Sequence, residues 1–392
     1  MSQRRSQLIR DIDSTVEYGH RQILKHREGP DDLWLAYFVG GTQLSVCASA
    51  ASFQFDIRIG RAESGTIGEK DHKALIRRLP NSGAARCHVL NYAGPEISAK
   101  ILTSLHEPLK GNTTTTIAHM LDFVAGKVRS TGSVDTLDTR CSGGNRIYPA
   151  AASAIALATW QPAEREAELE RLSAFLCREF DRGSGEWQPA DMGTPDLAVN
   201  AAAFTALRLM GTGDSVVRPA AQAIVATVTK GLSGQFYEEK LGKNASDMYV
   251  PLKLNRYSWA TEALVAMRGL VREPERKKAL IALARTLLDR YRPMSANNGN
   301  PGRELPGQES IEEFARDMIA LWTIRQELSH RFGPRFLAWR FTTWKRLPAK
   351  KQRSSVEKKA DPEQQMLHWT KASVIVGAAI GIAGILIALL LG

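Results

Sequence analysis

Cysteine is scarce in this sequence and short metal-binding spacings are absent. The chain has four cysteines in 392 residues and no Cys-x-x-Cys pair. A disulfide-built miniprotein is therefore excluded, and the cysteines and histidines do not follow the spacing of a zinc site. No Walker-type loop occurs, and no Gly-x-Gly-x-x-Gly precedes an expected helix. We therefore expect no metal and no other cofactor.

The N-terminus also lacks an apolar run. The segment from Met1 to His20 carries charges throughout, so it does not resemble a secretory signal. With 43% hydrophobic and 24% charged residues, the composition is ordinary for a folded chain and argues against disorder as the dominant state. The net charge of +11 indicates an acidic partner, either nucleic acid or a membrane surface.

The positive charge is concentrated in one short segment. Residues 331–371 hold eleven basic and three acidic residues, a net charge of +8. The rest of the chain has 41 basic against 38 acidic residues and is nearly neutral. The acidic partner is therefore expected at this segment and not at the body of the protein.

An uncharged run of twenty residues, 372–391, follows the basic segment. A helix needs about 20 apolar residues to cross a bilayer, so the run predicts a single C-terminal transmembrane helix. The preceding positive charge predicts a tail-anchored, single-pass membrane protein with its N-terminal body in the cytoplasm. Gly377, Gly381 and Gly384 have the spacing of a helix-packing face, which leaves a homo-oligomer through the span and a lone helix equally open.

The basic segment mixes cations with aromatic rings. We expect an interfacial helix over 331–347 and a polar linker over 348–371, with anionic lipids as the partner. The same composition is typical of single-stranded nucleic-acid binding, which the adjacent span disfavours. The expected membrane-surface residues are Arg335, Trp339, Arg340, Trp344, Lys345 and Arg346.

From residue 118 to 330 the pattern is a helical-hairpin array. Glu164 to Phe180 has a polar face, and a turn over 181–187 separates it from a small-residue helix, Leu197 to Met210. Thr194-Pro195-Asp196 predicts the start of that second helix, with Thr194 as its N-cap. Similar small-residue helices are expected over Ala150 to Trp160, over Tyr257 to Leu270 and from Ser310 onward. Alanine-rich helices pack closely, so these would form an inner layer inside the charged ones.

The N-terminal part, 1–117, has a different pattern. One long helix is predicted over Ser6 to Arg27, followed by a mixed α/β segment. Strict alternation over Ser52 to Ile59 predicts a half-exposed strand, with Cys87 to Tyr92 as its partner. The expected fold class is therefore mostly α, with a small β element near the N-terminus.

The repeat resembles that of the terpenoid cyclase and prenyltransferase α/α-toroid superfamily. The shared features are the turn Gly183-Ser-Gly-Glu-Trp187, the Thr-Pro-Asp start and the small-residue helix, and they extend loosely over residues 118–328. The resemblance implies a central cavity that takes lipid-like substrates. It also implies an Asp-x-Asp-Asp motif in members that protonate an alkene, and that motif does not occur here.

Acidic residues on the expected inner helices are the candidates for chemistry. Asp317 and Glu262 lie inside their helices and are the catalytic candidates, although a solvated face or an ion pair explains them as well. The expected cavity lining is Asp196, Asn200, Tyr257, Trp259 and Arg316.

Two functions follow from these patterns. The first is a tail-anchored scaffold or binding protein at the inner membrane surface, which recognises a lipid, a small molecule or a protein in its concave face. The alternative is a membrane-associated enzyme of the toroid superfamily that modifies an isoprenoid. The missing catalytic motif favours the scaffold, and the contents of the central cavity distinguish the two.

Overall fold

The computed structural model describes most of the chain up to residue 329. The described ranges are 2–27, 33–38, 44–60, 69–87, 92–109, 111–136, 147–161, 163–188, 196–232, 234–243, 249–291 and 310–329. They all belong to the compact unit Met1–Lys345, which is separate from a second unit, Arg346–Gly392.

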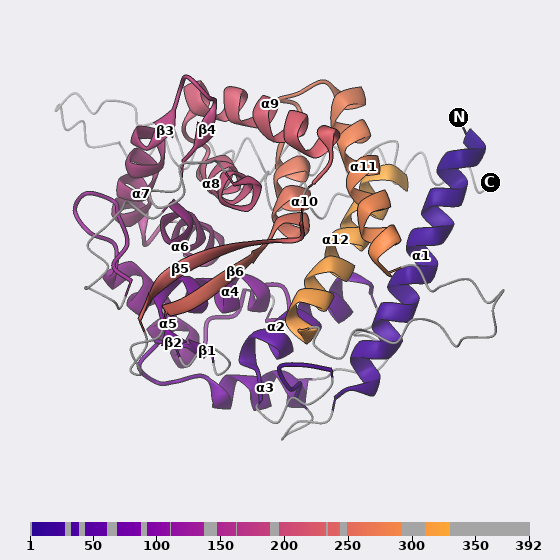
Figure 1. The fold of residues 1–392 in the computed structure, drawn as a ribbon. Coiled ribbons are helices and arrows are strands. Elements are labelled where there is room, and N and C mark those ends of the chain that lie inside the picture. Colours follow the sequence, from indigo (N-terminus) through magenta and orange to yellow (C-terminus); the bar gives the residue numbers. More distant parts are fainter. Residues whose placement is uncertain are drawn as a thin grey trace, which may run out of the picture. The chain divides into compact units, whose positions relative to one another are not determined.

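A closed ring of helices organises the described residues (Figure 1). Each of these inner helices packs against the next one along the chain, and the last packs against the first. We call this set the inner ring. Its members are α2 (Val46–Arg58), α4 (Pro95–Leu105), α6 (Ile147–Trp160), α8 (Leu197–Met210), α10 (Arg256–Ala266) and α12 (Ile311–Ser329).

A second set of helices packs on the outside of the inner ring, one before each inner helix in the chain (Figure 1). These helices carry charged or polar outer faces, whereas α6 and α8 are buried along almost their whole length. The outer helices are α1 (Ser2–Lys25), α3 (Glu69–Arg78), α5 (Thr115–Gly126), α7 (Glu166–Arg178), α9 (Asp214–Lys230) and α11 (Glu273–Tyr291). The predicted division into small-residue inner and charged outer helices is confirmed.

Short antiparallel hairpins occupy several connections between outer and inner helices. Their strands are β1 (Arg86–Cys87) with β2 (Tyr92–Ala93), β3 (Phe180–Asp181) with β4 (Glu186–Trp187), and β5 (Phe236–Lys243) with β6 (Tyr249–Asn255). In β5–β6 the register pairs Phe236 with Asn255, and Asn255 then caps α10 by accepting from the amide of Ser258. The hairpin therefore leads directly into an inner helix.

Polar side chains at the fourth position of some inner helices fix the preceding connection. Asn200 accepts a hydrogen bond from the Trp187 amide at 2.7 Å and donates to the Trp187 carbonyl at 3.2 Å. Trp187 also donates from its ring to the carbonyl of Leu176 at 2.7 Å, which ties α7 to α8. The equivalent contacts in α2 and α4 are Trp34 N to Ser49 Oγ at 3.2 Å and Ala85 N to Ser98 Oγ at 2.9 Å. Such bonds satisfy buried amides that a loop would otherwise leave unpaired.

The strand predicted over Ser52 to Ile59 is wrong. Ser52 to Arg58 belong to α2 and Ile59 is its C-cap, and Phe53, Gln54 and Phe55 are all buried. A helix enclosed on most sides by other helices needs no polar face, so the residue pattern carries no helical period. Cys87 and Tyr92 pair with each other in β1–β2 and not with this segment. The long N-terminal helix is confirmed as α1.

The predicted N-cap of α8 also needs correction. Asp196, and not Thr194, caps the helix, because its carboxylate accepts from the amide of Ala198 at 2.7 Å. Thr194 itself lies outside the described residues.

The predicted transmembrane helix is withdrawn. In the part of the chain that the structure describes, no helix is both long enough and apolar enough to cross a membrane. The most apolar helix, α6, has 14 residues, short of the ~20 that a span requires. The predicted interfacial helix (331–347), linker (348–371) and span (372–391) lie outside the described residues. The fold class with a C-terminal span, and the single-pass localisation that depended on it, are corrected accordingly.

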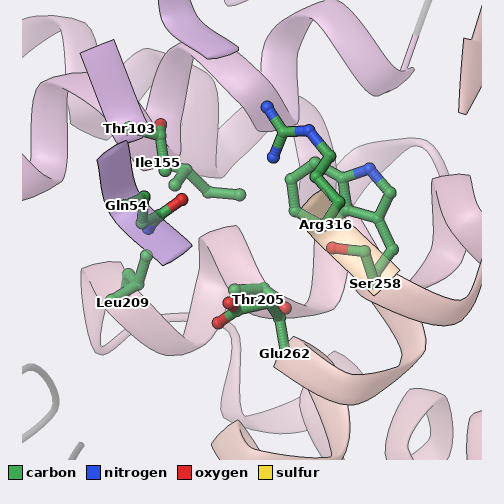
Figure 2. A pocket seen from close by; sticks show the side chains of 9 residues that line it. Gln54, Thr103, Ile155, Thr205, Leu209, Ser258, Glu262 and Arg316 are labelled. Carbon is green, nitrogen blue, oxygen red and sulfur yellow. The ribbon is translucent and has the colours of Figure 1, made fainter. Parts of the chain in front are cut away.

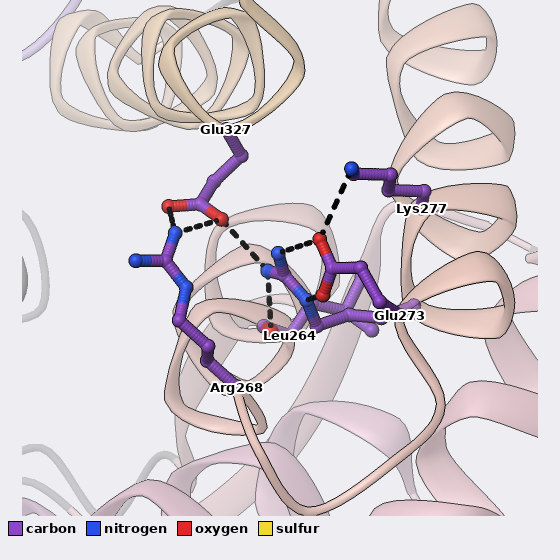
Figure 3. Close-up of polar contacts among 6 residues, drawn as sticks. Leu264, Arg268, Glu273, Lys277 and Glu327 are labelled. Atoms are coloured by element: carbon purple, nitrogen blue, oxygen red, sulfur yellow. Dashed lines mark hydrogen bonds and ion pairs between the residues drawn. The ribbon is translucent and has the colours of Figure 1, made fainter. Parts of the chain in front are cut away.

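A buried charge network joins α10, α11 and α12 (Figure 3). Arg276 is 1% exposed. It donates one hydrogen bond to Glu327 at 2.8 Å and two to Glu273, both at 2.9 Å. Glu327 also accepts two bonds from Arg268, at 2.8 and 2.7 Å. Because every charge has a partner, the network holds the three helices without an unpaired buried ion.

Replacing Glu327 by alanine should strongly destabilise the protein. The substitution removes a carboxylate that neutralises buried Arg276, and breaking such a pair costs about 3–5 kcal/mol. Denaturant unfolding measures this free energy. Glu275→Ala is the matched control, because Glu275 pairs with the exposed Arg272 and its loss should produce no measurable change. Equal stability of the two variants would contradict the assigned role of Glu327.

Replacing Gly132 by alanine should cost more than replacing Gly211. Both glycines have positive φ, so alanine meets the same left-handed penalty of about 1–2 kcal/mol at each. A Cβ on Gly132 would lie 2.0 Å from the Arg171 carbonyl oxygen, whereas one on Gly211 meets no atom within 4 Å. We expect an additional cost of about 1–3 kcal/mol for Gly132→Ala, measured by thermal unfolding of both variants. Equal costs would show that the turn does not pack on α7 in this way.

Candidate functional site

The inner helices of the described part of the chain all contribute to one central cavity (Figure 2). Its open volume is about 50 Å³. The lining residues come from every member of the inner ring, with α8 and α10 supplying more than one. They are Gln54, Thr103, Ile155, Thr205, Leu209, Ser258, Trp259, Glu262 and Arg316.

Lining residues recur at helical spacing on the two inner helices that supply more than one of them. On α8, Thr205 and Leu209 are one turn apart, and on α10 Trp259 and Glu262 are likewise one turn apart. Residues three or four apart share one face of a helix. The cavity therefore lies on the faces that the helices turn toward the centre of the inner ring.

One ion cluster borders the cavity through Arg316. Lys100 Nζ lies 2.5 Å from Glu312 Oε1, and Arg316 Nε lies 2.9 Å from the same oxygen. Arg316 also donates to Ser104 Oγ at 3.3 Å. Burial alone would raise the pKa of Glu312, but Lys100 and Arg316 outweigh it and lower this pKa to about 2. The cluster therefore keeps its carboxylate ionised at any ordinary pH.

Tyr148 and Glu313 respond to the same charges. Burial raises the pKa of Tyr148 to about 12, against the opposing effect of Lys100 and Arg316. Burial, together with the charge of Glu312, raises the pKa of Glu313 to about 7. Two adjacent carboxyl groups on the first turn of α12 thus have pKa values displaced in opposite directions.

A second ion cluster borders the cavity through Glu262. Arg58 bonds to Glu107 through two contacts, at 2.8 and 3.0 Å, and its Nη1 lies 3.3 Å from Glu262 Oε1. Burial alone would lower the pKa of Arg58, but Glu107 and Glu262 outweigh it and raise this pKa. The Arg58 carbonyl also accepts a 2.7 Å bond from the ring of Trp322, which links α2 to α12.

Three of the residues predicted from the sequence line the cavity. Trp259 and Arg316 were expected in the lining, and Glu262 was expected as a catalytic carboxylate. Trp259 stacks edge-on against Tyr148, with ring centroids 5.8 Å apart. The catalytic role itself stays a prediction, since geometry alone does not test it.

The remaining predicted residues lie elsewhere. Asp196 caps α8 and pairs with Arg256 at 2.7 Å, and Asn200 holds the Trp187 backbone. Tyr257 is buried beside these groups and is not part of the lining. Asp317 is fully buried and accepts from Gln235, Asn255 and Tyr291 at 2.8, 2.7 and 2.6 Å. These four contribute to the polar packing around the starts of α8 and α10.

The residues predicted for the membrane surface and for span packing cannot be placed. Arg335, Trp339, Arg340, Trp344, Lys345 and Arg346, with Gly377, Gly381 and Gly384, all lie outside the described residues. Among the described residues, no group of three His, Cys, Asp or Glu side chains could hold a metal ion.

The sequence reasoning missed several side chains of the cavity and of its ion clusters. Gln54 and Arg58 lie in the segment misread as a strand, and Lys100 and Thr103 lie in α4, which was not predicted. A signal was present, because Trp34 precedes α2 as Trp187 precedes α8. Each ring donates to a carbonyl at the end of the preceding outer helix, Ile23 for Trp34 and Leu176 for Trp187.

Known proteins resemble this chain in structure but not in sequence. No known protein family and no curated protein matches it. An α-1,6-mannanase of glycoside hydrolase family 76 from Salegentibacter sp. HEL1_6 has a TM-score of 0.57 and 11% identity, covering 81% of this chain and 100% of that one. A type II terpene cyclase from Scytonema, in complex with geranylgeranyl dihydroxybenzoate, has a TM-score of 0.52 and 12% identity, covering 82% and 99%. A protein from Actinoplanes has a TM-score of 0.53 and 16% identity, covering 80% and 99%.

These likenesses show the fold. The predicted resemblance to the α/α-toroid superfamily is confirmed at that level. The tail-anchored scaffold is corrected, because the described residues contain no helix that could span a membrane and the solved structures that share the fold include enzymes.

Replacing Glu313 by glutamine should change how stability depends on pH between about 4.5 and 7. The folded pKa of about 7 lies above the ordinary value of 4.5, so the folded state binds the extra proton in this window. The free energy of unfolding of the wild type therefore falls as pH rises through the window. Glu313→Gln should lose less stability over this range, as measured by denaturant unfolding at a series of pH values.

Glu312→Gln is the control with the opposite sign. Its folded pKa of about 2 lies below 4.5, so Glu312 stabilises the fold above pH 4.5 and this contribution disappears as pH falls toward 2. Because the charge of Glu312 also helps to raise the pKa of Glu313, the variant should show a shallower slope than the wild type between pH 5 and 7, and it should lack the stability that the wild type loses in acid. A Glu313→Gln slope identical to that of the wild type would contradict the raised pKa.

Proposed function

We propose that the protein is an α/α-toroid enzyme that binds its substrate in the central cavity and uses Glu262 to accept or return a proton. The observation that carries the proposal is the composition of the cavity. A carboxylate and an indole ring from α10 and a guanidinium from α12 converge on one space at the centre of the inner ring.

The surroundings of Glu262 suit such a role. Its side chain is 22% exposed and lines the cavity, and Arg58 Nη1 lies 3.3 Å from its Oε1. Arg58 is held more firmly by Glu107, so the cation is fixed beside Glu262 without covering it. A positioned carboxylate within reach of a substrate hydroxyl contributes about 10²–10⁴-fold through general acid–base catalysis.

The solved structures that share the fold support an enzyme. The mannanase cleaves an α-1,6-mannan, and the terpene cyclase binds geranylgeranyl dihydroxybenzoate. Identities of 11% and 12% carry neither substrate to this chain. They define two substrate chemistries for a first assay, a glycoside and an isoprenoid. Both assays are needed, because the lining combines apolar side chains, Ile155, Leu209 and Trp259, with polar ones.

The test is turnover of α-1,6-mannotriose and of geranylgeranyl dihydroxybenzoate, followed by mass spectrometry of the products. Glu262→Gln keeps the shape of the side chain and removes its basicity, so kcat should fall by about 100-fold or more. Glu275→Gln, on the surface of α11, is the control and should keep wild-type turnover. The proposal fails if neither compound is converted or if Glu262→Gln retains full activity.

A further inference from the structure

Several uncharged polar side chains at the central cavity have no hydrogen-bond partner among the described residues. Gln54 is 5% exposed, lines the cavity and makes no side-chain hydrogen bond to the described residues. The hydroxyl of Ser258, another lining residue, also makes no hydrogen bond to the described residues. Thr205, 4% exposed, has a hydroxyl oxygen without a partner in the described part of the chain. A buried polar group without a partner costs about 1–3 kcal/mol, which a ligand can restore.

These groups can all act on one ligand. Gln54 comes from α2, Thr205 from α8 and Ser258 from α10, and all three line the same cavity (Figure 2). The Thr205 oxygen is screened from water by its neighbours. Threonine in a helix populates two χ1 rotamers, and rotation between them exchanges the methyl group with the hydroxyl. Thr103 adds an acceptor only, since its hydroxyl donates to the Ala99 carbonyl.

The charged groups around the cavity already have ionic partners within the protein. Arg316 shares the carboxylate of Glu312 with Lys100, and Arg58 is paired with Glu107 and Glu262. An ionic ligand would have to break one of these buried pairs and leave its partner uncompensated, at a cost of several kcal/mol. The cavity therefore favours a neutral ligand over a phosphate or a carboxylate.

Size and shape narrow the ligand further. The open volume of about 50 Å³ is several times the ~10–15 Å³ that one water molecule requires. It therefore admits one edge of a ring and not a long hydrocarbon chain. Trp259 offers an apolar platform for one face of such a ring, while Gln54 and Ser258 meet its hydroxyl groups.

We infer that the central cavity binds a neutral, hydroxyl-bearing ring through Gln54, Ser258 and Thr205, with Trp259 against its face. The inference rests on the proposed function and specifies its substrate class. It favours a polyhydroxylated substrate over an isoprenoid.

The experiment measures binding by isothermal titration calorimetry with three probes. Methyl α-D-mannopyranoside is a neutral ring, mannose 6-phosphate is its charged counterpart and geraniol is an isoprenoid. We expect the methyl glycoside to bind, and the other two to bind at least tenfold more weakly. Preferential binding of geraniol or of the phosphate would overturn the inference. Absence of all binding would do the same, because the cavity would then hold only water.

Gln54→Met tests the contact directly. Methionine keeps the length of the side chain and removes its donors and its acceptor, so affinity for the methyl glycoside should fall by about three- to tenfold. Because an unpaired amide is replaced by an apolar group, the melting temperature should stay the same or rise. A purely structural Gln54 would show the reverse, a lower melting temperature with unchanged affinity.

The control variants separate the remaining explanations. Gln222→Met changes the same residue type on the exposed face of α9 and should leave affinity unchanged. Thr205→Val should weaken binding, whereas Thr261→Val should not, since Thr261 donates to the Tyr257 carbonyl away from the cavity.

Failure of the proposed function and failure of the ligand class would give different results. If Glu262→Gln binds the methyl glycoside but no substrate is ever converted, the ligand class stands and the catalytic role does not. If geranylgeranyl dihydroxybenzoate is converted while the methyl glycoside does not bind, the enzyme stands and the ligand class does not.

Discussion

Charge pairing at the centre of the inner ring is the constraint on which the site depends. Lys100, Glu312 and Arg316 form one cluster of paired charges, and Arg58, Glu107 and Glu262 form another. Moving such ions out of water costs several kcal/mol each, so a buried charge persists only where a partner compensates it. Each cluster draws its members from more than one inner helix, and the pairs therefore also fix how these helices are rotated about their axes. The cavity between the clusters is left with uncharged groups for recognition.

Much of the fold could be predicted from the sequence where local signals agree. The inner helices α6, α8, α10 and α12 are small-residue segments between clear turns, and α8 ends at Gly211, which adopts the left-handed conformation that favours glycine. Within the cavity, Trp259, Glu262 and Arg316 were found because a polar or bulky residue inside an apolar helix is conspicuous. The resemblance to the toroid superfamily followed from the same repeat.

The remaining helices of the inner ring could not be predicted, because a helix that is buried on all sides shows no helical period of polar and apolar residues. In α2, Phe53 and Phe55 are separated by Gln54, and this alternation is typical of a strand. All three side chains are buried. Neighbouring helices cover Phe53 and Phe55, and Gln54 turns toward the central cavity. For Asp317 the sequence suggested a function that the structure does not support. Its place inside a helix suggested chemistry, but its partners come from β5, β6 and α11, distant segments that no local pattern connects. Tertiary partners decide the role of a buried polar residue, and sequence spacing does not reveal them.

The contacts of α12 have a consequence for how the protein is made. This helix packs against α1 and α2, and the packing includes bonds from Trp322 to the Arg58 carbonyl and from Arg325 to Asp13. The apolar faces of α1 and α2, the first helices to be synthesised, are therefore fully covered only when α12, the last inner helix, has packed against them. During vectorial synthesis the earlier hairpins form an open arc, and the faces of α1 and α2 that pack on α12 stay uncovered until residue 329 has left the ribosome. Ring closure is therefore a late, long-range step, and it converts a series of locally fixed hairpins into one cooperative body.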